Sequence, residues 1–357
     1  MSNFTTILLK WYQKHQRDLP WRHSKDPYKI WISEIILQQT RVNQGLPYYL
    51  KFEENYPTVN DLAAANINEI LKLWQGLGYY SRAHNLHKCA QKIVENHGGQ
   101  FPSTKTELLK LPGIGDYTAS AIASIAFGEK VVVLDGNVFR VLSRYFGIEK
   151  FIDSPDGRLA FKNVAEDCLN SASPSQYNQA LMEFGALQCK PKSPNCEVCP
   201  LRPSCVAHKN DWILKLPKKR GKTKVKEVFI SYICFVSENH LAMKKRDNLG
   251  IWKGLFEMPN VVSESKSKNI WQSSKEITEA IKTSKSFTQI IQLDHQLSHR
   301  KISATFFICE LNSQSDLNWP STSWVSSSEL SLLAIPRLID KFLKTRDGLA
   351  LQAMLES

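Results

Sequence analysis

The chain has 357 residues, a length that exceeds one compact core and favours two domains. Hydrophobic residues make up 42%, charged residues 22% and aromatic residues 10%, a globular composition that excludes a disordered or fibrous protein. No run reaches the roughly 18 consecutive apolar residues of a membrane span, and residues 1–16 lack the pattern of a signal or transit peptide. We therefore expect a cytoplasmic protein with no membrane partner.

Residues 1–210 are predicted to form an all-α domain, because their apolar side chains recur at helical spacing. One such run contains Trp31, Ile35 and Ile36, and a second extends from Leu62 to Trp74. Proline and glycine mark the expected breaks between helices, at Pro57, Gly76, Gly78, Gly98, Gly99, Pro112, Gly113 and Pro155.

A carboxylate pair is the first candidate for catalysis. Glu34 stands in an otherwise apolar helical run, and Asp135 follows the apolar residues 131–134. An apolar setting would raise the pKa of Glu34 and keep it available as an acid. Cleavage of a glycosidic bond uses one protonated carboxyl group for the leaving group and one carboxylate facing the sugar cation. The alternatives are a solvated helix charge for Glu34 and a turn or N-cap role for Asp135. The sequence alone does not bring the two together.

A glycine pair stands in Leu111-Pro112-Gly113-Ile114-Gly115, directly before an alanine-rich helical run. Glycines two positions apart predict a hairpin turn that opens onto the N-terminus of this helix. Backbone N–H groups at such a turn converge on a phosphate, aided by the positive end of the helix dipole. We therefore expect a helix-hairpin-helix in which Gly113 and Gly115 grip the DNA backbone. The alternative is a plain turn between two helices.

Four of the eight cysteines form a C-x6-C-x2-C-x5-C run, at Cys189, Cys196, Cys199 and Cys205. Four prolines among them disfavour a continuous helix and favour a loop folded around a metal centre. Tetrathiolate zinc and a four-iron cluster are both open chemically, and the single C-x2-C knuckle favours the cluster. The other four cysteines are scattered and are expected to pack as small hydrophobic side chains.

Residues 211–226 separate the two halves of the chain. They carry seven basic residues and one acidic residue, which is half of the net charge of +12. We expect a basic linker that lies along a polyanion, with a merely solvated linker as the alternative. Beyond it, residues 228–236 and 304–309 are predicted to be β-strands and residues 263–275 a loop, so that residues 227–357 form an α+β domain.

A family resemblance follows from these motifs in their order. The segments SEIILQQTRV, GLGYYSRAHNL, LPGIGDYTASAI, LDGNVFRVLSR and EFGAL, with the four-cysteine run, resemble the helix-hairpin-helix DNA glycosylases of the endonuclease III superfamily. Within that superfamily the chain is similar to the adenine glycosylases of the MutY type. Bifunctional members have a lysine nucleophile where this chain has Tyr117.

The resemblance implies a role for each matching residue. Glu34 would protonate the flipped adenine at N7 and later activate water, while Asp135 would stabilise the sugar cation. Asn137 and Tyr117 would order the site. The residues implied to contact adenine are Arg17, Arg22 and Glu183. The residues implied to hold an opposite 8-oxoguanine are Gln39, Thr40, Leu77 and Tyr79, of which Gln39 and Tyr79 would wedge into the stack.

The second half resembles the Nudix-like module of the same family, most clearly at residues 250–259. A working Nudix hydrolase needs an Arg-Glu and Glu-Glu pattern on the next helix, which residues 275–280 lack, so we expect no pyrophosphohydrolase activity. The recognition loop of the family is Phe-Ser-His, and this chain has Leu297, Ser298 and His299. Ser298 and His299 would form hydrogen bonds to the lesion, whereas Leu297 cannot supply the stacking of the family's aromatic residue.

Together these inferences predict a monofunctional adenine glycosylase that excises adenine opposite 8-oxoguanine or guanine. Its glycosylase domain would span residues 1–210 with an iron–sulfur loop at 189–205, the linker residues 211–226, and the Nudix-like domain residues 227–357. We expect one [4Fe-4S] cluster, double-stranded DNA as the partner, and a monomer. The alternatives are a bifunctional lyase acting on oxidised pyrimidines and a non-enzymatic iron–sulfur DNA-binding protein, which would be expected to lack Glu34 or Asp135.

Overall fold

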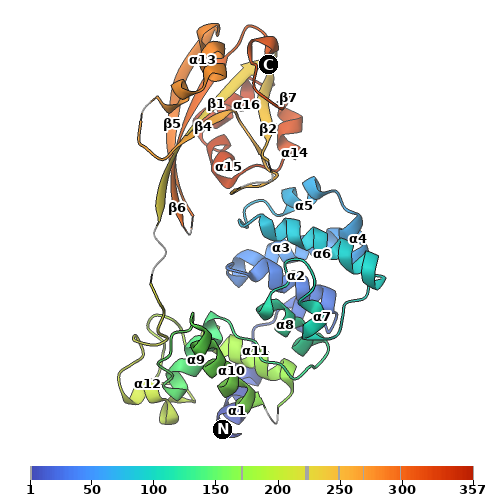
Figure 1. Cartoon of the computed structure of the whole chain (residues 1–357), viewed down its shortest axis with the longest axis vertical. Coiled ribbons are helices and arrows are strands. Elements are labelled where there is room, and N and C mark those ends of the chain that lie inside the picture. Colours follow the sequence, from blue (N-terminus) through green and yellow to red (C-terminus); the bar gives the residue numbers. More distant parts are fainter. Residues whose placement is uncertain are drawn as a thin grey trace. The chain divides into compact units, whose positions relative to one another are not determined.

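The computed structural model describes residues 2–169, 172–221, 225–247, 250–267, 269–297 and 299–356. The chain divides into two compact units, which are described separately (Figure 1). The first contains residues 1–64 and 85–221, and the second contains residues 65–84 and 222–357. The domain limits expected from the sequence stay a prediction. Among the described residues no helix is long and apolar enough to cross a membrane.

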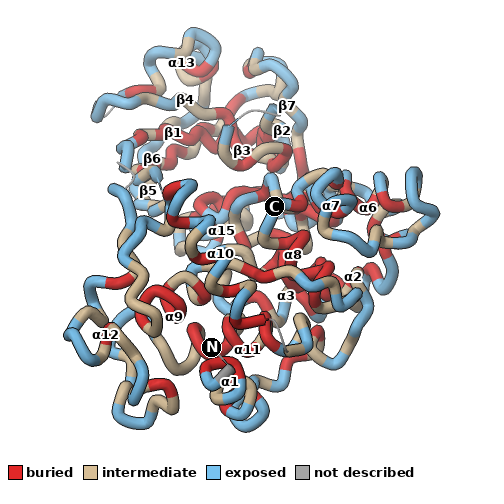
Figure 2. Tube along the Cα trace, turned by 60° about the horizontal axis from the view of Figure 1, so that its bottom comes forward, coloured by how far each residue is buried: buried red, intermediate tan, exposed pale blue. Residues whose placement is uncertain are grey.

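The first unit is helical, as predicted. Its elements are α1 (Ser2–His15), η1 (Pro20–Arg22), α2 (Pro27–Leu37), α3 (Val42–Asn55), α4 (Val59–Ala64), most of α6 (Ser81–His97), α7 (Lys105–Leu108), α8 (Asp116–Ala126), α9 (Gly136–Phe146), α10 (Pro155–Leu169), α11 (Pro174–Leu187), η2 (Arg202–Ser204) and α12 (Val206–Lys209). Helix α11 packs against α1, α8 and α9, and α2 packs against α3 and α8. Figure 2 shows the buried stretches of α2, α8 and α11 in red.

Local signals set where these helices begin and end. Helix α2 begins with Pro27, and the Asp26 carboxylate caps it by accepting from the Tyr28 N–H at 2.9 Å. Helix α9 ends at Gly147, whose φ of +70° is the left-handed conformation that glycine adopts without strain. The apolar run from Leu62 to Trp74 is helical, as its spacing predicts, and it forms two helices, because Asn66 caps a new helix by accepting from the Asn68 N–H.

The second unit is built on a seven-stranded sheet with the order β3-β2-β1-β6-β5, in which β4 pairs with β1 and β7 with β2. The strands are β1 (Lys226–Ser237), β2 (His240–Lys245), β3 (Phe256–Glu257), β4 (Asn260–Ser263), β5 (Ser286–Gln296), β6 (Arg300–Glu310) and β7 (Thr322–Val325). The pair β1·β6 is parallel, with Tyr232 opposite Phe306, and the other pairs are antiparallel. Both predicted strands are confirmed, as β1 and β6.

Helices complete the second unit: α5 (Ile67–Leu73), α13 (Lys275–Lys282), α14 (Ser327–Leu332), α15 (Arg337–Leu343) and α16 (Arg346–Ala353), with η3 (Ile270–Ser273) and η4 (Gln314–Asp316). Helix α13 buries Ile277 and Ala280 in a core with Ile233 and Phe235 of β1. The rings of Tyr232, Phe306 and Phe342 stack in series, with centroids 5.2 and 4.1 Å apart. The expected loop 263–275 holds for residues 264–267 and 269, and beyond these residues η3 and the start of α13 interrupt the loop.

Candidate active site

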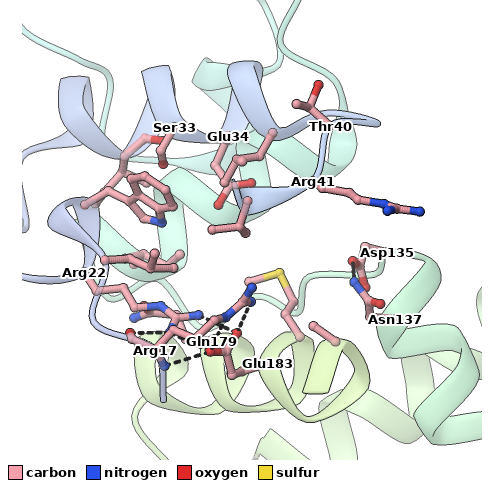
Figure 3. Close-up of a pocket in the computed structure, with 18 of the residues that line it drawn as sticks. Arg17, Arg22, Ser33, Glu34, Thr40, Arg41, Asp135, Asn137, Gln179 and Glu183 are labelled. Carbon is pink, nitrogen blue, oxygen red and sulfur yellow. Dashed lines mark hydrogen bonds and ion pairs between the residues drawn. The ribbon is translucent and has the colours of Figure 1, made fainter. Parts of the chain in front are cut away.

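A cavity of about 510 Å³ opens in the first unit, between α2, α8, α11 and the N-terminal ends of α3 and α9 (Figure 3). It gathers eight of the residues singled out in the sequence, although they are spread over more than 160 positions of the chain. These are Arg17, Arg22, Glu34, Thr40, Tyr117, Asp135, Asn137 and Glu183. The fold thus brings the two carboxylates, which the sequence left apart, to one cavity.

Glu34 projects into this cavity from a helix that is otherwise buried. The Tyr117 hydroxyl donates a hydrogen bond of 2.6 Å to Glu34 Oε2. Burial raises the pKa of Glu34 to about 7, and the nearby Asp135 carboxylate adds to the increase, while the Tyr117 bond and Arg22 oppose it. Glu34 therefore holds its proton over most of the acid range and about half of the time at neutral pH.

Asp135 lies at the N-cap of α9, so the alternative N-cap role is also real. One carboxylate oxygen accepts from the Val138 N–H at 2.7 Å, and the other accepts from the Asn137 amide at 2.7 Å. Burial raises the pKa of Asp135, and these two bonds oppose the increase because they favour the charged form. The Asn137 side-chain oxygen in turn accepts from Arg140 at 2.8 Å, which fixes the orientation of the amide.

Glu183 forms a buried charge cluster with two arginines at the side of the cavity (Figure 3). The Arg22 guanidinium donates to both carboxylate oxygens, at 2.9 and 2.8 Å. Arg17 donates from its backbone N–H and from Nε, each at 2.9 Å to Oε1. Burial alone would raise the pKa of Glu183, but the bonds from Arg17 and Arg22 outweigh it and lower the pKa to about 2. Glu183 is therefore a permanent anion and can only accept hydrogen bonds.

Five predicted residues lie elsewhere. Gln39 follows α2 with a φ of +56° and does not line the cavity within the described residues. Leu77, Tyr79 and His299 belong to the second unit, and Ser298 lies outside the described residues.

The cavity also contains residues that the sequence analysis did not single out, including Arg41, Asn43, Gln179 and Met182. Arg41 directly follows Thr40 in the segment SEIILQQTRV, so its place in that motif could have indicated it. Gln179 and Met182 lie one turn and one residue before Glu183 on α11, so helical spacing from Glu183 would have found Gln179.

The glycine pair forms a turn between α7 and α8. Gly113 has a φ of +76°, and a Cβ atom there would lie 2.6 Å from the Asn85 Cβ, so only glycine fits. Gly115 is the N-cap of α8, and a Cβ on it would meet no atom within 4 Å. The N-terminus of α8 is thus uncovered by neighbouring atoms at Gly115.

The four clustered cysteines line one small cavity together with Arg202 and His208. Two arginines of α9 hold the loop: Arg140 Nε donates to the Cys189 carbonyl at 2.7 Å, and Arg144 Nη1 donates to the Lys190 carbonyl at 2.7 Å. Over the described residues, no three His, Cys, Asp or Glu side chains are close enough to hold a single ion. Four thiols that line one cavity are the donor set that either a tetrathiolate zinc ion or an iron–sulfur cluster requires.

The remaining cysteines, Cys89, Cys168, Cys234 and Cys309, are buried, as expected for small hydrophobic side chains.

Comparison with known proteins locates two family matches. Residues 32–165 match the HhH-GPD superfamily of base excision DNA repair proteins, and residues 231–345 match the NUDIX domain. An adenine DNA glycosylase of Buchnera aphidicola from Acyrthosiphon pisum is 36% identical over 83% of both chains. The rat adenine DNA glycosylase is 31% identical over 96% of this chain and 77% of its own.

Solved structures agree with the helical fold of the first unit. A thermostable thymine-DNA glycosylase has a TM-score of 0.54 and 33% identity, over 58% of this chain and 95% of its own. An endonuclease III in a non-covalent complex with DNA has a TM-score of 0.52 over the same share of this chain and 95% of its own, at 24% identity.

Proposed function

Since this chain belongs to the adenine DNA glycosylase family and is a hydrolase of N-glycosyl bonds, we propose that it removes adenine paired with 8-oxoguanine or guanine in double-stranded DNA. The observation that carries this proposal is the burial of Glu34 in one cavity with Asp135. Its carboxyl group is buried, has a pKa of about 7, and faces the same cavity as Asp135. This is the pair of carboxylates that glycosidic cleavage uses.

The reaction begins when adenine flips out of the duplex into the cavity. Glu34 donates its proton to N7 of the base, which makes the purine a better leaving group. The bond between N9 and C1′ then breaks, and both its electrons leave with adenine. The Asp135 carboxylate stabilises the sugar cation that remains. Water adds to C1′ and gives a proton to Glu34, which is now ionised, so the acid is restored and an abasic site is formed.

Glu183 would act on adenine through the two arginines that it holds. Its carboxylate is an anion and accepts five hydrogen bonds, three from Arg17 and two from Arg22. A carboxylate has about four lone-pair positions, so these bonds leave it no free acceptor for the adenine amino group. Glu183 therefore positions Arg17 and Arg22 at the side of the cavity, where their guanidinium groups would meet the base.

A lyase step is disfavoured by the composition of the cavity. A bifunctional enzyme needs an amine that attacks C1′ and forms a Schiff base. Tyr117 occupies the position of that lysine and is bonded to Glu34, and no lysine lines the cavity among the described residues. The product is therefore an intact strand with an abasic site.

The opposite base would be read by Gln39, Thr40, Leu77 and Tyr79 and by the loop that contains Ser298 and His299. Replacing both loop residues, Ser298→Ala/His299→Ala, removes the hydrogen bonds that their side chains would form to the lesion. We expect the preference for 8-oxoguanine over guanine to fall while cleavage of A·G duplexes stays within about tenfold, which is a barrier change of about 1.4 kcal/mol. An unchanged preference would assign discrimination to the other four residues.

Cys189, Cys196, Cys199 and Cys205 would hold one [4Fe-4S] cluster, whose role is to organise the basic loop around it. Residues Lys190, Lys192 and Arg202 stand in or next to this loop and supply positive charge for a DNA backbone. The Nudix-like unit is proposed to have no hydrolase activity, because α13 carries only Glu276 and Glu279 as acidic residues. The protein would act as a monomer.

The test is single-turnover cleavage of three duplexes, which carry A opposite 8-oxoguanine, A opposite guanine, and an oxidised pyrimidine. We expect strand breaks only after alkali and only in the first two. Cleavage of the oxidised pyrimidine without alkali, or trapping of a covalent complex by borohydride, would favour the lyase.

A further inference from the structure

Residues 65–84 form one compact unit with residues 222–357, although they are far away in the sequence. Three hydrogen bonds connect this segment with α15 and with the residues between α14 and α15. The Lys72 ammonium donates to the Leu333 carbonyl at 3.0 Å. The Ile335 N–H donates to the Gln75 side-chain oxygen at 3.3 Å, and the Gln75 amide donates to Asp340 at 3.4 Å. Burial lowers the pKa of Lys72, which agrees with an ammonium that is partly removed from water.

The contacts continue to both sides of these residues. Arg337 Nη1 lies 3.5 Å from the Gly76 carbonyl oxygen. At the other end of the segment, His84 Nε2 lies 3.1 Å from the Lys253 carbonyl oxygen. Gly254 packs so closely that a Cβ on it would lie 3.0 Å from the His84 ring. The segment is therefore held before and after residues 77–83.

Between these two holds lies a turn with an unusual backbone. Gly76 and Gly78 have φ angles of +102° and +74°, and Tyr79 has a φ of +47°. The left-handed conformation is strained for a non-glycine residue, so it persists only where its surroundings fix it. Arg82 supplies part of that support by donating to the Leu77 and Gly78 carbonyls at 3.3 and 3.2 Å.

Trp74 also supports the turn. Its indole N–H donates to the Gly78 carbonyl at 3.0 Å, and the Arg82 guanidinium lies over its ring at 5.0 Å. Trp74 directly precedes Gln75 and Gly76, the residues that bond to the second domain. A displacement of Gln75 would therefore move its neighbours Trp74 and Gly76. It would disturb the hydrogen bond from the Trp74 indole to the Gly78 carbonyl and the contact between Gly76 and Arg337.

We propose that residues 333–340 form a clamp that holds the turn 76–80 in place through their hydrogen bonds with Lys72, Gln75 and Gly76. Residues 222–357, the C-terminal domain, thereby set the conformation in which Leu77 and Tyr79 meet the base opposite adenine. This rests on the function proposed above for those two residues. The C-terminal domain then contributes to lesion selectivity in two separate ways, through the loop at residues 297–299 and through the clamp.

The test uses the full chain with the variant Arg337→Ala/Asp340→Ala. This variant removes the contact of Arg337 with the Gly76 carbonyl and the hydrogen bond from the Gln75 amide to Asp340. Both side chains lie at the surface, with Arg337 exposed and Asp340 half-buried. The matched control is Arg346→Ala/Asp347→Ala, which makes the same charge change on the next helix. A third variant, Asp340→Asn, keeps an acceptor for the Gln75 amide and should behave as the unmodified protein.

The first readout is hydrogen exchange of the backbone amides of residues 74–80, which does not depend on catalysis. We expect at least tenfold faster exchange in Arg337→Ala/Asp340→Ala and a change below twofold in the control and in Asp340→Asn. The second readout is the ratio of cleavage rates on A·8-oxoguanine and A·G duplexes, which should fall at least fivefold while the A·G rate stays within twofold.

Unchanged exchange in the clamp variant would overturn the proposal, and so would faster exchange with an unchanged ratio. If the unmodified protein showed no preference for 8-oxoguanine, the proposed function would fail, and the exchange readout would still decide whether the clamp exists.

Discussion

Glu34→Gln is expected to stabilise the protein at alkaline pH, at the same time as it removes the acid. The pKa of Glu34 rises from about 4.5 to about 7 on folding, so the folded state binds more protons than the unfolded state between these values. Stability is therefore lost as the pH rises from about 4.5 to about 7. A shift of this size corresponds to about 3 kcal/mol at 1.36 kcal/mol for each pH unit. Glutamine is uncharged at every pH and avoids that loss.

Urea unfolding at pH 5 and at pH 8 measures this effect. We expect Glu34→Gln to unfold with nearly the wild-type free energy at pH 5 and with about 3 kcal/mol more at pH 8. The matched control is Glu54→Gln, because Glu54 is an exposed residue of α3. It should change the free energy of unfolding by less than about 0.5 kcal/mol at either pH. An equal gain at both pH values, or a loss at pH 8, would refute a buried carboxyl group with a raised pKa.

Three further changes have defined outcomes. Tyr117→Phe removes the hydrogen bond that lowers the pKa of Glu34, so the alkaline limb of the single-turnover rate should move to higher pH by about 1 unit, and no movement would contradict the role of this bond. Protein purified without oxygen should show broad visible absorption and about four irons per chain, whereas colourless protein with one zinc would contradict the cluster. Gly113→Ala should destabilise the protein by about 1–3 kcal/mol in thermal unfolding, because the added Cβ would meet Asn85. Gly115→Ala should change the stability by less than about 1 kcal/mol, because a Cβ there meets no atom. Equal effects of the two substitutions would contradict the packing described for the hairpin.

The sequence was most informative where chemistry and local structure share one signal. The apolar setting of Glu34 predicted a raised pKa, and the structure agrees because burial is the main cause of the shift. The glycine pair predicted a turn before a helix. The prediction succeeded because Gly113 has a positive φ and no room for a Cβ atom, and both features require glycine. Strand β1 was predictable because it is buried along most of its length, and β6 because its residues 304–309 are mostly apolar.

Long-range pairing was beyond single-sequence reasoning. Nothing near position 183 indicates that Glu183 pairs with both Arg17 and Arg22, since that contact depends on how α11 packs against α1 and α8. The edge strand β5 was missed because its side chains are mostly polar or half-exposed. The grouping of residues 65–84 with the second domain was also missed, because the hydrogen bonds that hold it use backbone groups as much as side chains.

In the proposed reaction, Glu34 supplies the proton for adenine release and Asp135 supplies the negative charge that stabilises the sugar cation. The most direct measurement is base release in a single turnover together with duplex affinity, for the wild-type protein, Glu34→Gln and Asp135→Asn. Binding of the backbone does not use the carboxyl proton, so both variants should bind an A·8-oxoguanine duplex with affinities near that of the wild type. Base release should be abolished in Glu34→Gln and severely impaired in Asp135→Asn. Full base release by Glu34→Gln would contradict the account.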